Sequence, residues 1–364
     1  MKPLILLTGK TGQLGGELLP LLPQLGELVA LDRTQMNLER PDEISRVIRQ
    51  VRPQLIINAG AYTAVDQAES DAATAQAINA EAPGVMAEEA KKLGAALIHY
   101  STDYVFDGSK NGPYQESDPP NPLNVYGKSK LAGEEAIRSA GIPHLIFRTS
   151  WVYGTRGKNF LLTMLRLAAE RKELRVVSDQ TGAPTTASYL AATTARILST
   201  LRGLRYEEDA AGALRDQGGT YHLTAAGLTT WYGFANAIFD EAAKIANDAP
   251  CSRAAAAGSR TDLTQDAAKA SLVTSASAVR GSRIEETAAK GTGAGEAAGN
   301  ALKFPKGFVV PMVVPITTKE LGSVARRPLY SGLSNKKIQE TFGLEPSYWH
   351  EQLHNCFATS QTQV

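Results

Sequence analysis

The sequence predicts an α/β fold in which a doubly wound parallel sheet is followed by a smaller, interleaved C-terminal lobe. Short apolar segments alternate with segments of helical character through the first 149 residues. A glycine-rich turn follows the first apolar segment, and polar residues follow several of the others. Alternation of this kind implies parallel strands joined by right-handed crossovers, with ligands bound at the carboxyl ends of the strands.

The individual elements follow from short apolar runs and the helical segments between them. Residues 4–8 are a continuous apolar run that ends at a glycine, which is typical of a strand buried in a parallel sheet. Residues 17–25 have helical character, and 27–32 are a second short strand. The alternation continues with helices at 41–51, 75–93 and 126–140 and strands at 55–59, 96–101 and 144–149. Several polar segments therefore converge on one crevice at the strand ends.

Beyond Trp151 the strict alternation weakens, which indicates a mixed lobe interleaved with the first domain. Helices are expected at 159–171 and 188–201, and strands at 175–178 and 219–223, the last returning to the main sheet. We expect a cofactor-binding Rossmann domain at 1–149 and a substrate-binding lobe at 150–249 and 301–364. The segment 250–300 is rich in alanine, glycine and serine, poor in large apolar residues and without aromatic residues, so we expect a flexible insertion. A partner-binding helix is the alternative there.

Composition excludes several classes of function. The formal net charge of the 364 residues is +1 and 21% of them are charged, which gives no electrostatic case for nucleic acid or an anionic membrane. The N-terminal apolar run is too short for a signal peptide, and no segment is long enough to span a bilayer. Cys251 and Cys356 form no CxxC pattern, so a reducing cytoplasm fits best and no cysteine metal site is indicated.

The glycine-rich turn predicts a dinucleotide site. Gly9, Gly12 and Gly15 form GxxGxxG between an expected strand and helix, where glycines permit close backbone approach to a pyrophosphate. Asp32 ends the second strand, where a carboxylate binds the adenine-ribose hydroxyls, while the adjacent Arg33 suits a 2′-phosphate. NADPH and NADH therefore both remain open. A phosphate-binding NTPase loop is disfavoured because it needs a glycine at position 4, which is leucine.

A tyrosine and a lysine predict acid–base chemistry. Tyr126 and Lys130 are four positions apart and so share one face of the helix at 126–140. A nearby cation favours the phenolate, whose parent phenol has an ordinary pKa near 10. Alone, this spacing is better explained by the start of an amphipathic helix with a solvated lysine. The string His350-Glu351-Gln352-Leu353-His354 matches a zinc-protease motif, but only ten residues follow, so a surface helix is the better interpretation.

Together these motifs resemble the dTDP-4-dehydrorhamnose reductase family of the extended short-chain dehydrogenase/reductase superfamily. The resemblance covers nearly the whole chain outside 250–300 and continues into the C-terminal part. It is carried by residues 9–15, 58–66, 101–108, 126–130, 148–154, 179–185, 325–328 and 342–344.

The resemblance implies an oxidoreductase that catalyses the last step of dTDP-rhamnose biosynthesis, the reduction of the C4 ketone of a dTDP-linked sugar by NADPH or NADH. Tyr126 would donate the proton, Lys130 would lower its pKa and hold the nicotinamide ribose, and Thr102 would bind the substrate oxygen. The implied substrate-binding residues are Thr102, Asp103, Tyr104 and Trp151. The implied cofactor-binding residues are Gly9, Thr11, Gly12, Gln13, Leu14, Gly15, Asp32, Arg33, Asn37, Leu38, Ala59, Ala61, Tyr62, Thr63, Tyr126 and Lys130.

Two alternatives come with the resemblance. It extends to the regulatory beta subunit of methionine adenosyltransferase, a binding protein that keeps the fold and binds NADP, and to reductases of other nucleotide 4-ketosugars. It also implies a homodimer and Mg²⁺, although the sequence has no recognisable set of metal ligands and we predict no metal site. The Thr102, Tyr126 and Lys130 set together with Trp151 favours the reductase.

Overall fold

The computed structural model describes residues 2–201, 210–248, 302 and 309–361. The described residues up to Asn247 and those after residue 301 belong to one compact unit. The predicted insertion at 250–300 lies outside the described residues, so its flexibility stays a prediction. The division of this unit into a Rossmann domain and a substrate lobe also stays a prediction.

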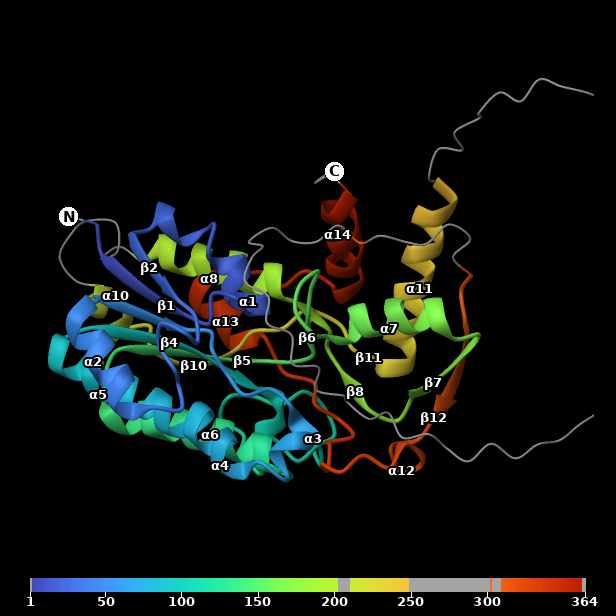
Figure 1. The fold of residues 1–364 in the computed structure, drawn as a ribbon, viewed down its shortest axis with the longest axis horizontal. Coiled ribbons are helices and arrows are strands. Elements are labelled where there is room, and N and C mark those ends of the chain that lie inside the picture. Colours follow the sequence, from blue (N-terminus) through green and yellow to red (C-terminus); the bar gives the residue numbers. More distant parts are fainter. Residues whose placement is uncertain (1, 202–209, 249–301, 303–308, 362–364) are drawn as a thin grey trace, which may run out of the picture. The chain divides into compact units, whose positions relative to one another are not determined.

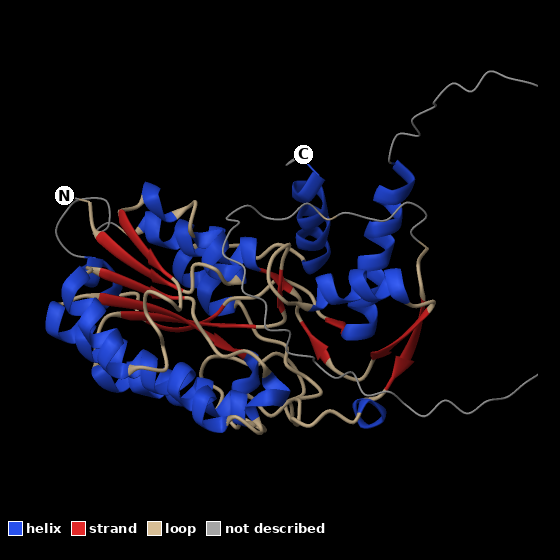
Figure 2. Ribbon diagram, in the orientation of Figure 1, coloured by secondary structure: helices blue, strands red, loops and turns tan. Residues whose placement is uncertain are grey.

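A six-stranded parallel sheet forms the centre of this unit, as the sequence predicts (Figures 1 and 2). The strand order β10-β5-β4-β3-β1-β2 is that of a doubly wound sheet. The strand order reverses at β1, because β2 lies on one side of β1 and β3 on the other. The predicted return of residues 219–223 to this sheet is confirmed, because β10 pairs with β5 in parallel. The strands are β1 (Leu4–Thr8), β2 (Glu27–Leu31), β3 (Leu55–Asn58), β4 (Ala96–Thr102), β5 (His144–Thr149) and β10 (Gly219–His222).

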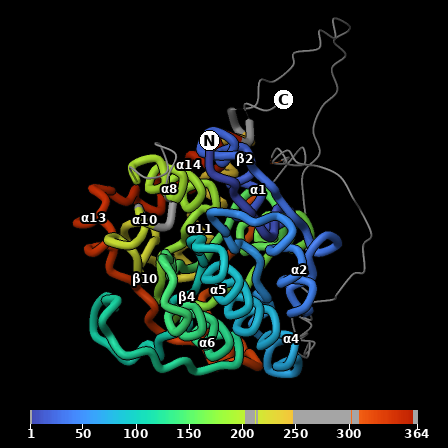
Figure 3. The backbone as a smooth tube through the Cα atoms, turned by 90° about the vertical axis from the view of Figure 1, so that its left-hand side faces the viewer, coloured from blue at the N-terminus to red at the C-terminus, as the bar shows by residue number. Residues whose placement is uncertain are grey.

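Helices cover both faces of the sheet (Figure 3). One face packs its buried Leu and Ile side chains against α2 (Pro41–Val51), α5 (Ala82–Leu93) and α6 (Val125–Ala140). The other face packs against α1 (Gln13–Leu18), α8 (Ala187–Thr200) and α13 (Lys336–Phe342). Burial on both faces explains why the strands are apolar without alternation.

Two helices differ from the expected bounds. The first was expected at 17–25, but α1 begins at Gln13, directly after the glycine turn, and a 3-10 turn η1 (Leu22–Gln24) follows it. The helix expected at 75–93 starts earlier, with α4 (Ala72–Gln76), and continues through a π-helical segment, η2 (Ala77–Glu81), into α5. Two short elements within residues 2–149 were not predicted, α3 (Val65–Ala68) and the 3-10 turn η3 (Asp103–Val105).

The rest of this unit has its own apolar core, built by α7 (Phe160–Glu170), α11 (Trp231–Asp248) and α14 (Trp349–Gln361). Here β7 (Glu173–Val177) pairs in parallel with β12 (Met312–Ile316), so chain from both sides of residues 250–300 builds one sheet. The remaining elements are β6 (Val152–Tyr153), β8 (Thr181–Gly182), β9 (Thr185–Thr186), β11 (Thr229–Thr230), α10 (Ala210–Arg215) and α12 (Thr318–Leu321). In the described ranges, no helix has both the length and the apolarity to cross a bilayer.

Candidate active site

A cavity of about 450 Å³ lies at the carboxyl ends of β1, β3, β4 and β5. It extends from the glycine turn to Tyr126 and Lys130, so it brings together the two motifs that the sequence singled out. Fourteen of the sixteen predicted cofactor residues line it: Gly9, Thr11, Gly12, Gln13, Leu14, Asp32, Arg33, Asn37, Leu38, Ala59, Ala61, Thr63, Tyr126 and Lys130.

Glycine is required at the turn because two backbone segments touch there. A Cβ on Gly15 would lie 2.1 Å from the carbonyl oxygen of Gly9, and Gly9 itself has a φ of +71°. No larger residue fits either position without moving the backbone. Gly15 therefore supports the turn from behind and does not itself line the cavity. The turn presents backbone to the cavity, which fits the close approach of a pyrophosphate.

Asp32 lies at the end of the cavity where the sequence predicts the adenine ribose. Its carboxylate accepts hydrogen bonds from the Thr34 backbone and hydroxyl, which lower the pKa of Asp32. Its second oxygen lies 3.2 Å from the ammonium nitrogen of Lys10. Arg33 is exposed and paired with Glu39. Lys10 was not among the predicted cofactor residues, although it lies inside the glycine motif, and its positive charge offsets that of Asp32.

Tyr62 is the other predicted cofactor residue that does not line the cavity. Its phenol donates a hydrogen bond to Asp71, and its backbone N–H donates to the side chain of Asn79. The residue therefore anchors the loop after β3 to the helices behind it. Its neighbours Ala61 and Thr63 reach the cavity from the same loop.

At the catalytic end, Thr102 and Tyr126 are hydrogen-bonded to each other. Thr102 ends β4, and Tyr126 lies in the first turn of α6, which begins where Asn124 caps the Gly127 N–H at 2.7 Å. Burial raises the pKa of Tyr126, and its hydrogen bond with Thr102 offsets this only in part. The uncharged phenol is therefore favoured, as a proton donor requires.

Lys130 is buried, with 1% of its surface exposed, and lines the same cavity. Its nitrogen donates to the Tyr100 carbonyl at 2.7 Å and lies 3.1 Å from Nε2 of His99. Burial lowers the pKa of Lys130 to about 8, and the nearby Glu134 carboxylate counteracts this. Burial raises the pKa of Tyr126, and the lowering by Lys130 that the resemblance implies stays a prediction.

None of the four predicted substrate residues lines this cavity, although Thr102, Asp103 and Tyr104 adjoin Tyr126. Asp103 is buried, and burial raises its pKa to about 6, against the opposing effect of hydrogen bonds from Ser331 and Thr102. Thr102 donates to Oδ1 at 3.0 Å, whereas Oδ2 has no partner of ordinary hydrogen-bond geometry among the described residues. The ring of Tyr104 meets that of Tyr126 edge-on at 5.6 Å between centroids. Trp151 stacks on Trp231 at 3.5 Å between centroids. A buried carboxylate oxygen without a donor suits a ligand that brings hydroxyl groups.

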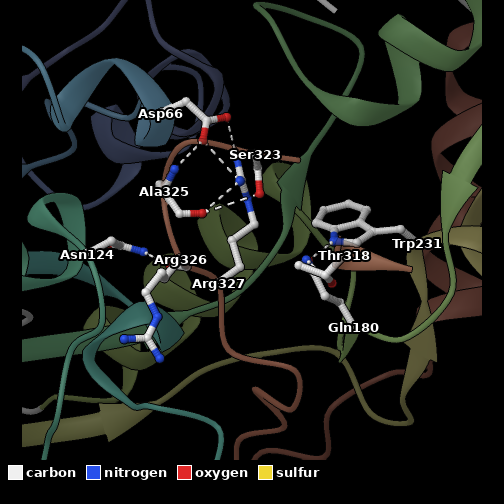
Figure 4. A network of polar contacts seen from close by, with 9 residues as sticks. All are labelled: Asp66, Asn124, Gln180, Trp231, Thr318, Ser323, Ala325, Arg326 and Arg327. Carbon is white, nitrogen blue, oxygen red and sulfur yellow. Dashed lines mark hydrogen bonds and ion pairs between the residues drawn. The ribbon is translucent and has the colours of Figure 1, made fainter. Parts of the chain in front are cut away.

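The C-terminal segment supplies contacts that the sequence did not predict (Figure 4). Arg327 makes a two-pronged ion pair with Asp66, at 2.6 and 3.0 Å, and also hydrogen-bonds Tyr104. The Nδ2 of Asn124 donates to the carbonyl of Arg326. The motifs around Asp66 and Arg327 were visible in the sequence, but nothing in their spacing indicated that they meet.

A second network, also drawn in Figure 4, supports the tryptophan stack. Trp231 Nε1 donates to Gln180 Oε1 at 3.1 Å, and Gln180 Nε2 donates to Thr318 Oγ1 at 3.0 Å. Trp151 has a φ of +48°, which is rare for a residue with a side chain. The network thus fixes the ring on which this strained residue stacks.

The HExxH string lies on α14. His354 contacts Glu241 of α11 at 3.0 Å, and His350 stacks on Trp349. Within the part of the chain that the structure describes, no group of three or more His, Cys, Asp or Glu side chains is arranged to hold a metal ion.

Comparisons with known proteins agree with this geometry. The chain matches the family model of the RmlD substrate binding domain over residues 1–282 and 286–362. It is 40% identical to dTDP-4-dehydrorhamnose reductase from Burkholderia thailandensis over 97% of each chain. It is 49% identical to the Escherichia coli K12 enzyme of the same name over 66% of this chain and 78% of that protein. The crystal structure of dTDP-4-dehydrorhamnose reductase from Bacillus anthracis in complex with NADP superposes with a TM-score of 0.73 and 29% identity, covering 99% of this chain and 100% of that chain.

Proposed function

The chain belongs to the RmlD substrate-binding-domain family, and we propose that it is an NADPH- or NADH-dependent reductase of dTDP-4-dehydro-L-rhamnose that produces dTDP-L-rhamnose. The observation that carries this proposal is that Tyr126 and Lys130 line the same cavity as the glycine turn and Asp32, and that Tyr126 is hydrogen-bonded to Thr102. The relatives named after this reaction cover nearly the whole chain.

The bound dinucleotide would supply the hydride. Tyr126 is suited to give a proton to the developing C4 alkoxide, because burial keeps its phenol protonated. Thr102, hydrogen-bonded to that phenol, would hold the same substrate oxygen. Lys130, which donates to the Tyr100 carbonyl, would bind the nicotinamide ribose. Trp151 and Tyr104 would form the walls against the sugar.

The adenine end supports the use of NADPH. A lone carboxylate at Asp32 would repel a 2′-phosphate, but the Lys10 ammonium at 3.2 Å offsets its charge. A phosphate at this position would therefore meet a cation beside the carboxylate. We propose that NADPH is accepted at least as well as NADH.

Mixing the protein with NADPH and dTDP-4-dehydro-L-rhamnose and following the absorbance of the reduced cofactor tests the proposal. We expect steady substrate-dependent oxidation, and its absence with both cofactors would contradict the assignment. A panel of other nucleotide 4-ketosugars distinguishes a sister reductase. Recovery of a methionine adenosyltransferase catalytic subunit in a pull-down, without reductase activity, would instead favour the binding-protein alternative.

The proposed partner is thus a dTDP-sugar, and the proposed location is the cytoplasm, where nucleotide sugars and reduced dinucleotides are both available. A homodimer and a role for Mg²⁺ stay predictions from the family resemblance.

A further inference from the structure

A chain of buried polar side chains connects the glycine turn to Lys130. Thr8, which precedes Gly9, donates its hydroxyl to Asn58 Oδ1 at 2.7 Å. Asn58 Nδ2 lies 3.1 Å from His99 Nδ1, and His99 Nε2 lies 3.1 Å from Lys130 Nζ. Each of the four side chains is at most 2% exposed. Three neighbouring strands and the catalytic helix therefore share one hydrogen-bonded network.

The backbone sets the polarity of this network. The N–H of Gly60 donates to Asn58 Oδ1 at 3.2 Å, and a backbone N–H cannot accept. The amide of Asn58 is therefore oriented with its oxygen toward Gly60 and Thr8 and its NH₂ group toward His99. His99 Nδ1 must accept from that group. In the neutral ring the proton then lies on Nε2, which faces Lys130.

An Nε2–H group of His99 that points at Lys130 favours the neutral amine of that lysine over its ammonium form. An ammonium has three donors and no acceptor, so it would oppose the donor of His99. A neutral amine accepts from Nε2–H through its lone pair and still donates to the Tyr100 carbonyl. We propose that His99 is a positioning residue that donates to Lys130, favours its neutral amine in the cofactor-free protein, and so couples dinucleotide binding to the uptake of one proton by Lys130.

The charged surroundings of Lys130 agree with this assignment. Burial lowers the pKa of His99 well below its ordinary value, and a charge on Lys130 would lower it further, so the ring is neutral in either form of Lys130. On the same helix, Glu134 favours the ammonium, but its two oxygens are already bonded to Arg148 and, with Ser101 and Arg138, it is fully satisfied. Tyr126, on the same face of the helix, is uncharged because burial raises its pKa.

The anionic dinucleotide changes this balance. Its pyrophosphate and ribose hydroxyls bring negative charge and acceptors into the cavity that Lys130 lines, which favours the ammonium. The proton comes from the buffer. This second half of the inference rests on the proposed function, because it requires a bound dinucleotide, whereas the tautomer of His99 does not.

The tautomer is measured directly in the cofactor-free protein by ¹⁵N NMR of labelled histidine side chains, with a His99→Asn sample to assign the signal. We expect a neutral ring with the proton on Nε2 across pH 6–9. A proton on Nδ1, or a doubly protonated ring, would overturn the proposal whatever the enzyme activity. Asn58→Asp provides the opposite case, since a carboxylate accepts from Nδ1–H and makes Nε2 an acceptor; the tautomer should invert.

Proton uptake is measured by calorimetric titration with NADPH in buffers of different ionisation enthalpy. With a Lys130 pKa of about 8, we expect uptake of about half a proton at pH 8 and almost none at pH 6.5. His99→Asn retains the acceptor for Asn58 but removes the donor to Lys130, so uptake at pH 8 should fall at least about twofold; Asn58→Asp should lower it in the same direction.

A purely structural role for His99 would weaken NADPH binding in His99→Asn and leave the number of protons unchanged, which would contradict the coupling. Failure of the wild-type protein to bind any dinucleotide would overturn the proposed function and the coupling together. The NMR result would then still decide the role of His99.

Discussion

The titratable side chains at the catalytic end are buried, and burial shifts each of them toward its uncharged form. The pKa of Tyr126 is raised, that of Asp103 is raised to about 6, and that of Lys130 is lowered to about 8. A ligand that brings charge and hydrogen-bonding groups would change these preferences. Charge states in this cavity therefore depend on what occupies it.

Removing the phenol hydroxyl of Tyr126 tests its role as proton donor. We expect Tyr126→Phe to lower kcat by roughly 10²–10⁴-fold, the usual contribution of a general acid, while the Kd for NADPH changes by less than about threefold. Steady-state kinetics and fluorescence titration measure the two quantities. Tyr348→Phe, which alters an exposed tyrosine, is the matched control. Turnover of Tyr126→Phe at the wild-type rate would exclude the assignment.

Asp103 should destabilise the free protein above neutral pH. Its pKa is raised from 3.8 to about 6 on folding, so the unfolded state loses its proton first and stability falls as the pH rises through that window. We expect Asp103→Asn to increase the free energy of unfolding at pH 8 by roughly 1–3 kcal/mol, with little gain at pH 3.5, while kcat/KM falls. Urea unfolding at both pH values measures it.

The matched control for Asp103 is Asp107→Asn. Hydrogen bonds from Ser109 lower the pKa of Asp107, so the same substitution there should reduce stability at pH 8. If both variants lose stability equally, the buried carboxylate of Asp103 does not destabilise the free protein, and the prediction is wrong.

Residues with a local signature were the ones the sequence could place. The glycine turn and the spacing of Tyr126 and Lys130 are local patterns, and both lie on the cavity. His99 carries no such pattern, because a single histidine in an apolar strand says nothing of its neighbours. Its contacts with Asn58 and Lys130 come from adjacent strands and a packed helix, which only the tertiary structure brings together.

At the scale of elements, strands were predicted more closely than helix starts. Apolar runs set the strands, and β1 agrees with its expected bounds. The start of α1 at Gln13 was missed because glycines at 15 and 16 conceal the helical pattern, and packing overrides their low propensity. Similarly, the π-helical segment η2 leaves no periodic signal in the sequence.

An ion pair that joins α5 to α2 should make stability depend on acid. Arg49 contacts both oxygens of Glu89, at 2.6 and 2.8 Å, and with Lys92 it lowers the pKa of Glu89 from 4.5 to about 2. A lowered pKa stabilises the fold above 4.5, and this contribution is lost as the pH falls to about 2.

Glu89→Gln tests this contribution. Because Arg49 and Lys92 are more than half exposed, solvent screening reduces the effect, and we expect a loss of roughly 1–2 kcal/mol at pH 7. The difference from the wild type should shrink at pH 3. Urea midpoints at the two pH values measure it, and an equal loss at both would attribute the effect to packing alone. Glu170→Gln, which breaks the exposed pair with Arg166, is the control and should cost less than about 0.5 kcal/mol.

At the scale of the molecule, long-range contacts tie the C-terminal segment to the catalytic helix. Arg327 pairs with Asp66 across 261 positions, and Asn124, which caps α6, also holds the Arg326 carbonyl (Figure 4). The start of the helix that carries Tyr126 therefore depends on chain from beyond residues 250–300. The spacing of residues in the sequence contains no information on such pairings. The fold class could therefore be predicted, whereas the contacts of the C-terminal segment with Asp66 and Asn124 could not.

Binding of NADPH at the glycine turn and Lys10 should raise the free energy of unfolding of the protein. A ligand at about 100 times its Kd adds roughly 2.7 kcal/mol, which for a chain of this size corresponds to a rise in Tm of roughly 3–5 °C. We expect this rise with NADPH, measured by scanning fluorimetry, and the same rise for Tyr126→Phe. Gly15→Val should abolish it, because its Cβ would lie 2.1 Å from the Gly9 carbonyl oxygen.

If Gly15→Val fails to fold, a second variant, Lys10→Met, tests the same site by comparing the Tm rise with NADPH and the Tm rise with NADH. Lys10 lies 3.2 Å from the Asp32 carboxylate, so Lys10→Met leaves that carboxylate facing the 2′-phosphate alone. At fixed ligand concentration, the Tm rise with NADPH should then fall below that with NADH, which has no phosphate at that position. Equal losses with both cofactors would mean that Lys10 supports the turn and does not compensate Asp32, and the argument for NADPH from charge balance would fail.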